Sequence, residues 1–402
     1  MKQQKQDRIL DEESQYSNNH LKKRNKKGKK AKKQQNPIQR FIRKVLLFAF
    51  ILIILSSTLY LGFKGYIFKK LSTEMFNNTP SVIYDSNKNI LAQIGAERNR
   101  ENINYDDVPQ ELINAYISIE DKRYFSHHGV DIKRTAGAIF SYVIHRGSSS
   151  FGGSTITQQL VKNLTGDDSN TASRKVREWF YAFILNFSFS KEKILEAYLN
   201  IIYTGPNIYG VKEASLYYFN KDVSELTLEE CAYLAGLTNS PNSYNPFSDT
   251  DKTQKITKRT KIVLNQMLEQ GYISQSEYNE AVNRVENGLN FSKGNIEEYT
   301  NINSYHTDAV INEAITDLQN KYFISKDFAT NYFCLAGTSI YSTVNTDIQS
   351  KLESELKNSK YILHSSNGSD TSQAAMVVID HSSRKCSWLC WWSWGQKKFT
   401  KL

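Results

Sequence analysis

One short segment, 119–131, gathers carboxylates, cations and two histidines around a glycine. Start signals at 107–110 and apolar residues at helical spacing after them predict a half-buried helix that ends near Glu120. An apolar wall and the negative end of the helix dipole would both raise the pKa of a carboxyl group at this position. Glu120 is therefore a candidate general base. A solvated helix end with surface ion pairs is the alternative interpretation.

A second segment, 152–164, begins with two glycines and a Thr-x-x-Gln capping box that opens a helix with one apolar face. Free backbone amides at the helix start, nearby hydroxyls and Lys162 would suit an anion, and phosphate is the natural candidate. A capped helix with a purely structural role remains the alternative.

A third segment, 173–178, places two cations one helical turn before a carboxylate: Arg174 and Lys175 before Glu178. The spacing is typical of a surface ion-pair ladder. It would also suit a cationic cradle for pyrophosphate that Glu178 holds in place, through a divalent metal such as Mg²⁺ or Mn²⁺ if one binds. Glu178 is then the candidate metal ligand, and we expect no organic cofactor.

The positive charge of the chain lies at its N-terminus. Residues 1–44 contain fifteen Lys or Arg and four Asp or Glu, which accounts for the formal net charge of +10. The composition predicts a disordered basic tail, and because the remainder is nearly neutral we expect no nucleic-acid partner.

An uncharged apolar stretch, Val45 to Phe63, follows the tail and is long enough to span a bilayer. We assign residues 45–66 to a retained transmembrane helix rather than a cleaved signal, because its apolar core is long and lacks a small-residue cleavage site. The basic flank predicts a single-pass protein of the cell membrane, with the N-terminus in the cytoplasm and the catalytic domain outside.

The rest of the chain predicts a mostly α-helical fold. Residues 67–105 read as a linker with a β-hairpin, and residues 106–300 as a helical domain. The apolar face of the predicted helix at 132–144 belongs either to the core, which we favour, or to a surface that dips into lipid.

These blocks together resemble the peptidoglycan glycosyltransferase domain, glycosyltransferase family 51, of class A penicillin-binding proteins. Their order and spacing carry the resemblance: Glu120-Asp121 with His127 and Gly129, Gly-Gly-Ser-Thr-Ile-Thr-Gln-Gln at 152–159, Arg174-Lys175-x-x-Glu178, Ile194-Leu195-Glu196-x-Tyr198-Leu199-Asn200, and Leu228-x-Glu230 through Leu237.

The resemblance implies a lysozyme-like helical domain that polymerises lipid II with inversion, using lipid II, an undecaprenyl-linked glycan chain and the membrane as partners. It implies that Glu120 and Glu178 are catalytic. It assigns substrate binding to Asp121, Arg123, His127, Ser154, Thr155, Gln158, Gln159, Lys162, Arg174 and Lys175. Asn170 stands where many relatives have Arg, so that cation is either missing or supplied by Lys122 or Arg177.

The C-terminal part, 301–383, resembles a small α+β linker remnant and the start of a transpeptidase domain. No Lys-Thr-Gly sequence occurs, so we predict that the transpeptidase is truncated. Residues 384–402 contain four tryptophans, and we interpret them as an aberrant, frameshifted and unstructured tail.

Two other functions stay open from the sequence: a lysozyme-like enzyme that cleaves peptidoglycan, and an inactive truncated membrane protein. The latter would bind cell-wall synthesis or division proteins.

Overall fold

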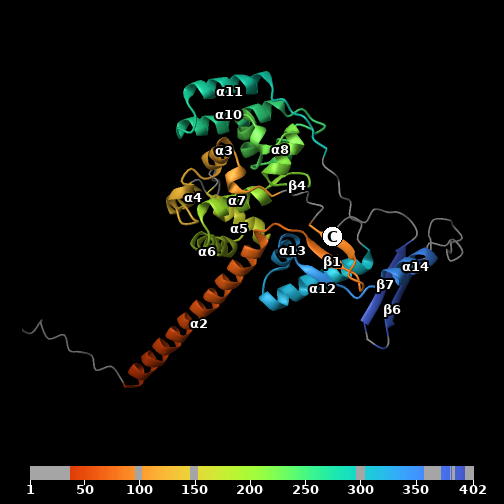
Figure 1. Ribbon diagram of the computed structural model, residues 1–402. Coiled ribbons are helices and arrows are strands. Elements are labelled where there is room, and N and C mark those ends of the chain that lie inside the picture. Colours follow the sequence, from red (N-terminus) through yellow and green to blue (C-terminus); the bar gives the residue numbers. More distant parts are fainter. Residues whose placement is uncertain are drawn as a thin grey trace, which may run out of the picture. The chain divides into compact units, whose positions relative to one another are not determined.

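The computed structural model describes residues 37–95, 102–144, 153–295, 304–356, 373–380, 382 and 385–393. The described chain is mostly helical, as predicted, and divides into two units, one up to Phe63 and one from Lys64 onward (Figure 1). Residues 1–36 of the predicted disordered tail (1–44) lie outside the described residues. The prediction is wrong for 37–44, which are helical.

The first long helix is α2 (Pro37–Met75). Its segment Phe41–Met75 is long and apolar enough to cross a membrane, and it is the one such helix among the described residues. We predicted that the helix ends at 66, but it continues because Ile67, Phe68 and Leu71 are buried at helical spacing.

A three-stranded sheet follows this helix. The predicted hairpin is present as β1 (Ser81–Tyr84) and β2 (Ile90–Ile94), which pair antiparallel. A strand far along the chain, β5 (Ser339–Tyr341), pairs parallel with β1. The linker therefore contains a contribution from the C-terminal part that sequence reasoning did not predict.

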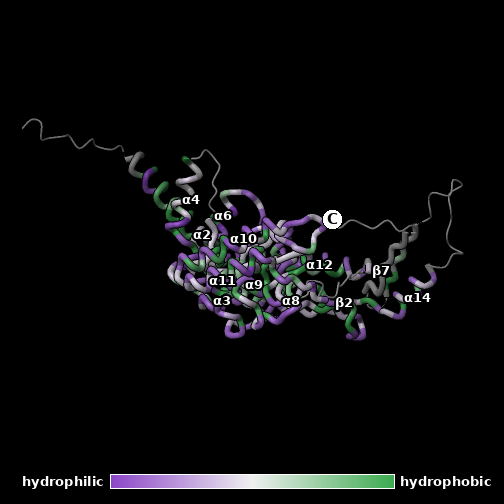
Figure 2. The backbone as a smooth tube through the Cα atoms, turned by 90° about the horizontal axis from the view of Figure 1, so that it is seen from above, coloured by the Kyte–Doolittle hydropathy of each residue, from purple (hydrophilic) through white to green (hydrophobic). Residues whose placement is uncertain are grey.

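The helical domain is built from short helices whose buried faces form one core, with hydrophobic and hydrophilic residues alternating along them (Figure 2). The helices are α3 (Gln110–Glu120), α4 (Ile132–Ile144), α5 (Ile156–Thr165), α6 (Ala172–Ser188), α7 (Lys191–Ile201), α8 (Val211–Phe219), α9 (Leu228–Leu237), α10 (Thr253–Glu269) and α11 (Gln275–Asn287). A two-stranded ribbon, β3 (Tyr203–Gly205) with β4 (Ile208–Tyr209), joins α7 to α8.

Helix α9 is the centre of this domain, because every residue from Glu229 to Leu237 is buried. Helices α3 and α10 both pack against it. One polar contact also ties α3 to α9: the Tyr116 hydroxyl donates to the Leu234 carbonyl at 3.3 Å. The end of α3 is therefore held against the end of α9.

Helix α4 departs from our interpretation of its apolar face. Ile132 is 70% exposed and Ile144 is 57% exposed, so the predicted core face is wrong at both ends of the helix. Among the described residues, no neighbouring element covers either side chain. The side chains of Ile139, Phe140 and Val143, in the middle of the predicted face, lie outside the described part of the structure.

The C-terminal part is packed more closely than we expected. Helices α12 (Tyr305–Tyr322) and α13 (Lys326–Leu335) follow the domain, and α13 packs against α5. The Asn331 side-chain amide donates to the carbonyl of Asn163 at 3.0 Å, at the last turn of α5. This contact satisfies a carbonyl that would otherwise lack an intrahelical partner.

The last described elements are α14 (Thr346–Leu356) and a ribbon of β6 (Gln373–Asp380) with β7 (Lys385–Ser393). The two strands pair antiparallel along their whole length. Our expectation that the tail from 384 is unstructured is therefore wrong for 385–393. Aromatic residues favour strands, and β6 offers a free edge for pairing.

Candidate active site

Glu120 is the last residue of α3, as predicted, and its carboxylate has two neutral hydrogen-bond donors. The Gln159 side-chain amide donates to Oε2 at 2.6 Å, and the Thr238 hydroxyl lies 3.0 Å from Oε1. The Arg134 guanidinium bonds to the backbone carbonyl of Glu120 and not to the carboxylate. The described contacts therefore leave the carboxylate without a directly bound cation.

Gln159 is itself held in place by helix α7. The Tyr198 hydroxyl donates to Gln159 Oε1 at 3.1 Å, which orients the amide nitrogen toward Glu120. Burial, together with the nearby charge of Glu120, raises the pKa of Tyr198 well above its ordinary value. The phenol thus stays protonated and remains a donor at neutral pH.

Asp121 is fully buried directly behind Glu120. Its Oδ2 lies 2.8 Å from His127 Nε2 and also accepts from the Ile156 backbone amide at 3.1 Å. A carboxylate at the start of α5 satisfies one of the free amides there and suits the helix dipole. Asp121 therefore fastens the end of α3 to the beginning of α5.

The loop between Asp121 and Asp131 closes through further contacts. Arg123 makes two hydrogen bonds to Asp131, at 2.8 and 2.6 Å. Gly129 has a φ of +88°, and a Cβ there would lie 2.4 Å from the Ala182 carbonyl, so the loop fits against α6 only with glycine. The Thr155 hydroxyl donates to the Gly129 carbonyl at 2.6 Å.

The predicted capping box at the start of α5 is present: Thr155 accepts from the Gln158 amide, and the Gln158 side chain accepts from the Thr155 amide. Gln158 also reaches the other predicted carboxylate, because its Nε2 donates to Glu178 Oε1 at 2.8 Å. Consecutive glutamines on α5 thus contact different glutamates, Gln158 contacting Glu178 and Gln159 contacting Glu120.

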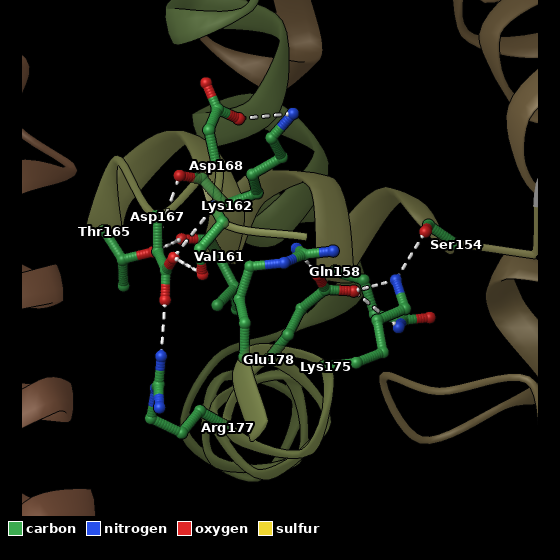
Figure 3. A network of polar contacts seen from close by, with 12 residues as sticks. Ser154, Gln158, Val161, Lys162, Thr165, Asp167, Asp168, Lys175, Arg177 and Glu178 are labelled. Carbon is green, nitrogen blue, oxygen red and sulfur yellow. Dashed lines mark hydrogen bonds and ion pairs between the residues drawn. The ribbon is translucent and has the colours of Figure 1, made fainter. Parts of the chain in front are cut away.

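Glu178 is buried on α6 between two cations. Arg174 Nη1 donates to Oε2 at 2.6 Å, and Lys175 Nζ bonds to Oε1. Lys175 also donates to the Ser154 hydroxyl at 2.7 Å, so Ser154, Gln158, Lys175 and Glu178 lie together (Figure 3). The bond from Arg174 to Glu178 completes this cluster of five residues. Within the described part of the chain Arg174 Nε has no hydrogen-bond partner, and the cluster carries one net positive charge.

Three other cations lie outside this cluster. Arg177 points to Asp167 and makes a 2.7 Å ion pair, and Lys162 pairs with Asp168 at 2.6 Å (Figure 3). Lys122 is 4.0 Å from Glu269. Neither Lys122 nor Arg177 therefore stands in for the cation that we expected near Asn170.

The structure brings most of the predicted residues together. Asp121, Thr155 and Gln158 are buried, the His127 side chain is 8% exposed, and all four have internal hydrogen-bond partners. Direct substrate binding by these four residues stays a prediction, and their contacts also suit the positioning of their neighbours. Arg123 is partly exposed but bound to Asp131. Ser154, Gln159, Arg174 and Lys175 are partly accessible.

Sequence reasoning missed a further cation, Lys191, at the start of α7. Its Nζ is buried without a hydrogen-bond partner among the described residues and lies 4.6 Å from the centre of the Tyr124 ring. Burial lowers the pKa of Lys191 to about 8, although Asp121 and Glu192 oppose the shift. Tyr124 is buried, and its hydroxyl donates to the Lys191 carbonyl at 2.6 Å.

The surroundings of Glu178 do not fit the predicted divalent metal. Both carboxylate oxygens already accept hydrogen bonds, and the two nearest partners are cations that would repel a metal ion. Within the described ranges, no group of three or more His, Cys, Asp or Glu side chains is placed to hold one. Metal dependence stays an untested prediction, and no step below passes through a metal.

Comparisons with known proteins identify this helical domain. A sequence model described as "Transglycosylase" matches residues 87–268. The chain is 35% identical over 369 residues to penicillin-binding protein 1A of Clostridium botulinum (strain Hall), covering 88% of this chain and 44% of that protein. It is 36% identical over 363 residues to the Clostridium acetobutylicum protein of the same name, covering 85% and 45%.

A relative from Bacillus subtilis (strain 168), penicillin-binding protein 1A/1B, is 37% identical over 276 residues, which cover 68% of this chain and 28% of that protein. The chain spans less than half the length of these relatives. A crystal structure of penicillin-binding protein 1A from Haemophilus influenzae also matches, at 22% sequence identity and a TM-score of 0.29. The match covers 69% of this chain and 28% of that one. Residues 87–268 therefore form a transglycosylase domain, in a chain that is similar to proteins named penicillin-binding protein 1A.

Proposed function

We propose that this protein is a peptidoglycan glycosyltransferase that polymerises lipid II into glycan strands during cell-wall synthesis. The observation that carries the proposal is the pair of glutamines on α5, which hold Glu120 and Glu178 in two different environments. One environment suits proton transfer and the other suits a bound anion. Glycosyl transfer from a pyrophosphate requires both.

Glu120 takes the role of the general base. The acceptor sugar's 4-hydroxyl loses its proton to the Glu120 carboxylate while the oxygen attacks the anomeric carbon of the donor, with inversion. The bond from that carbon to the pyrophosphate breaks in the same step, and undecaprenyl pyrophosphate leaves. The absence of a directly bound cation among the described contacts of the carboxylate supports this role, because a cation would oppose protonation.

The cluster around Glu178 takes the role of the leaving-group site. Pyrophosphate needs no proton to leave, so charge neutralisation suffices, and Arg174 and Lys175 provide it. Glu178 keeps both cations in place through its two carboxylate oxygens. Lys162 supplies a further charge when it leaves Asp168, because an exposed ion pair of this kind costs less than about 1 kcal/mol to break.

Two apolar features support a position at a membrane, where the lipid ends of both substrates lie. One is the long apolar helix Phe41–Met75, and the other is the pair of exposed apolar side chains at the two ends of the α4 face, Ile132 and Ile144. We propose that α2 anchors the protein as a single pass with the N-terminus in the cytoplasm. The α4 face then contacts the outer surface of the bilayer.

A lysozyme-like hydrolase would use a lone glutamate as an acid, and an inactive binding protein would need no carboxylate chemistry. Neither explains why two cations and a glutamine surround a buried Glu178. A single assay separates these functions, because a polymerase lengthens glycan chains from lipid II whereas a hydrolase shortens existing ones.

The test uses the purified full-length protein in detergent with labelled lipid II. We expect polymer from the wild type and a loss of about 1,000-fold in Glu120→Gln, since a general base contributes 10²–10⁴-fold. Glu111→Gln, which changes an exposed glutamate of the same helix, is the matched control and should keep the wild-type rate. Wild-type polymerisation by Glu120→Gln would remove Glu120 as the base.

A further inference from the structure

Thr238 contacts the proposed base, Glu120, although none of the sequence motifs described above includes Thr238. It is the C-cap residue of α9, half-buried, and its hydroxyl lies 3.0 Å from Glu120 Oε1. Helix α9 is the buried centre of the domain, so this hydroxyl is fixed relative to the end of α3. The position makes Thr238 a fixed neighbour of the carboxylate.

The Thr238 hydroxyl has two acceptors within reach. Its Oγ1 is 3.0 Å from Glu120 Oε1 and 3.0 Å from the Ala235 carbonyl oxygen. A hydroxyl has one proton, so it donates to one of these oxygens at a time, and its own lone pairs can accept a hydrogen bond. An ionised Glu120 attracts that proton more strongly than a carbonyl does.

Gln159, the other partner of Glu120, cannot change direction in this way. Its amide nitrogen donates to Glu120 while its oxygen is held by the Tyr198 hydroxyl. Gln159 therefore favours the ionised carboxylate only. Thr238 can serve as donor to the carboxylate or as acceptor from the carboxylic acid.

We propose that Thr238 is a positioning residue for the base. Its hydroxyl donates to Glu120 while the carboxylate is ionised. It turns to the Ala235 carbonyl once Glu120 has taken the proton from the acceptor sugar. The new O–H of Glu120 can then point to the Thr238 oxygen, so no proton passes between the two residues. This inference rests on the proposed function of Glu120.

Other charged or titratable groups surround the carboxylate, and they define what a pH profile can report. Tyr116 from α3 and Tyr198 from α7 face Glu120. Burial and, to a smaller extent, the charge of Glu120 raise the pKa of both phenols, so they stay neutral below pH 9. Arg134 from α4 bonds to the Glu120 backbone, and the Asp121–His127 pair lies behind it. Thr238 has no hydrogen bond to any of these groups among its described contacts.

The test compares Thr238→Val, which keeps the branched shape and removes the hydroxyl, with Thr238→Ser, which keeps the hydroxyl. We expect Thr238→Val to lower kcat about 10-fold, because it loses a hydrogen bond to a charged group. We also expect the acidic limb of its pH–rate profile to move upward by about one pH unit. Thr238→Ser should restore both values. Thr238→Ala replaces Thr238→Val if the latter fails to fold in a thermal melt.

A second measurement is independent of turnover. The protein labelled with ¹³C at glutamate carboxyls is titrated in detergent, and the Glu120 signal is identified by its loss in Glu120→Gln. The titration midpoint of Glu120 should rise in Thr238→Val and should keep its wild-type value in Thr238→Ser. An unchanged midpoint in Thr238→Val, or an equal change in Thr238→Ser, would overturn the role of Thr238. If the wild type fails to polymerise lipid II, the proposed function fails while this titration still decides the Thr238 contact.

Discussion

Two carboxylates of the same site, Glu120 and Glu178, lie in contrasting surroundings. Glu120 meets an amide and a hydroxyl, whereas Glu178 meets an amide and two cations. Neighbouring residues of α5, Gln159 and Gln158, supply the two amides. One helix turn therefore positions both groups, and the other partners set the difference between them.

The difference shows how one fold can prepare a proton acceptor and an anion site side by side. Neutral donors orient a carboxylate and oppose its protonation less than a bound cation does. Cations keep a carboxylate ionised and leave a net positive charge for an anionic ligand. The predictions below change one environment at a time, and the largest effect comes first.

After the loss expected for Glu120→Gln, the largest effect should come from removing a cation beside Glu178. We expect Lys175→Met to slow lipid II polymerisation about 100-fold, because the loss of one donor to developing negative charge typically costs 10²–10³-fold. Arg177→Met removes a cation of the same helix that pairs with Asp167 outside the cluster, so its rate should stay within about twofold of wild type. Equal losses in both variants would show that overall charge matters and the cluster does not.

A smaller effect should come from Lys191, the cation that has no hydrogen bond within the described chain. Burial lowers the pKa of Lys191 to about 8 from 10.5, so its charge destabilises the folded state below pH 8. Between pH 8 and 10.5 the unfolded chain binds more protons than the folded one, and this penalty fades as pH rises. We therefore expect Lys191→Met to melt about 2 °C higher than wild type at pH 7.

The same comparison at pH 9.5 provides the control for Lys191. The advantage of the Lys191→Met variant should shrink there, because the wild-type side chain is then mostly neutral in the folded protein. Thermal melts in detergent at both pH values measure it. An advantage that grows with pH would contradict the assignment of a penalised buried charge.

The smallest effect should come from the far end of α5, where Asn331 of α13 holds the last turn. Asn331→Ala removes the 3.0 Å hydrogen bond to the Asn163 carbonyl and should cost about 1 kcal/mol of unfolding free energy. Thr330→Ala, whose hydroxyl bonds only within α13 among the described contacts, is the control and should cost less. Asn331 contacts neither Glu120 nor Glu178 and supports only the helix that holds both. Any loss of activity in Asn331→Ala should therefore leave the pH profile and the salt dependence unchanged.

Local sequence patterns predicted much of this site. The capping box of α5, the end of α3 at Glu120 and the i+3 and i+4 pairs at Glu178 depend on residues close in the chain, and all three are present. The resemblance to a known family linked the blocks into one domain.

Long-range contacts were beyond local patterns. Thr238 reaches Glu120 from 118 residues away, and β5 joins β1 from the other end of the chain. Burial was equally beyond local patterns: Asp121 and Gln158 are polar residues, yet both are buried and hold other groups. Such contacts depend on how the helices pack, which the spacing of residues within a single segment does not predict.

The central claim is that neighbouring glutamines serve different carboxylates, and the pH dependence of kcat/KM in Gln159→Met and Gln158→Met tests it most directly. Gln159→Met should move the acidic limb to higher pH, because Glu120 loses a donor to its ionised form. Gln158→Met should leave that limb in place and raise KM for lipid II. Identical profiles for the two variants would contradict the division of roles between Glu120 and Glu178.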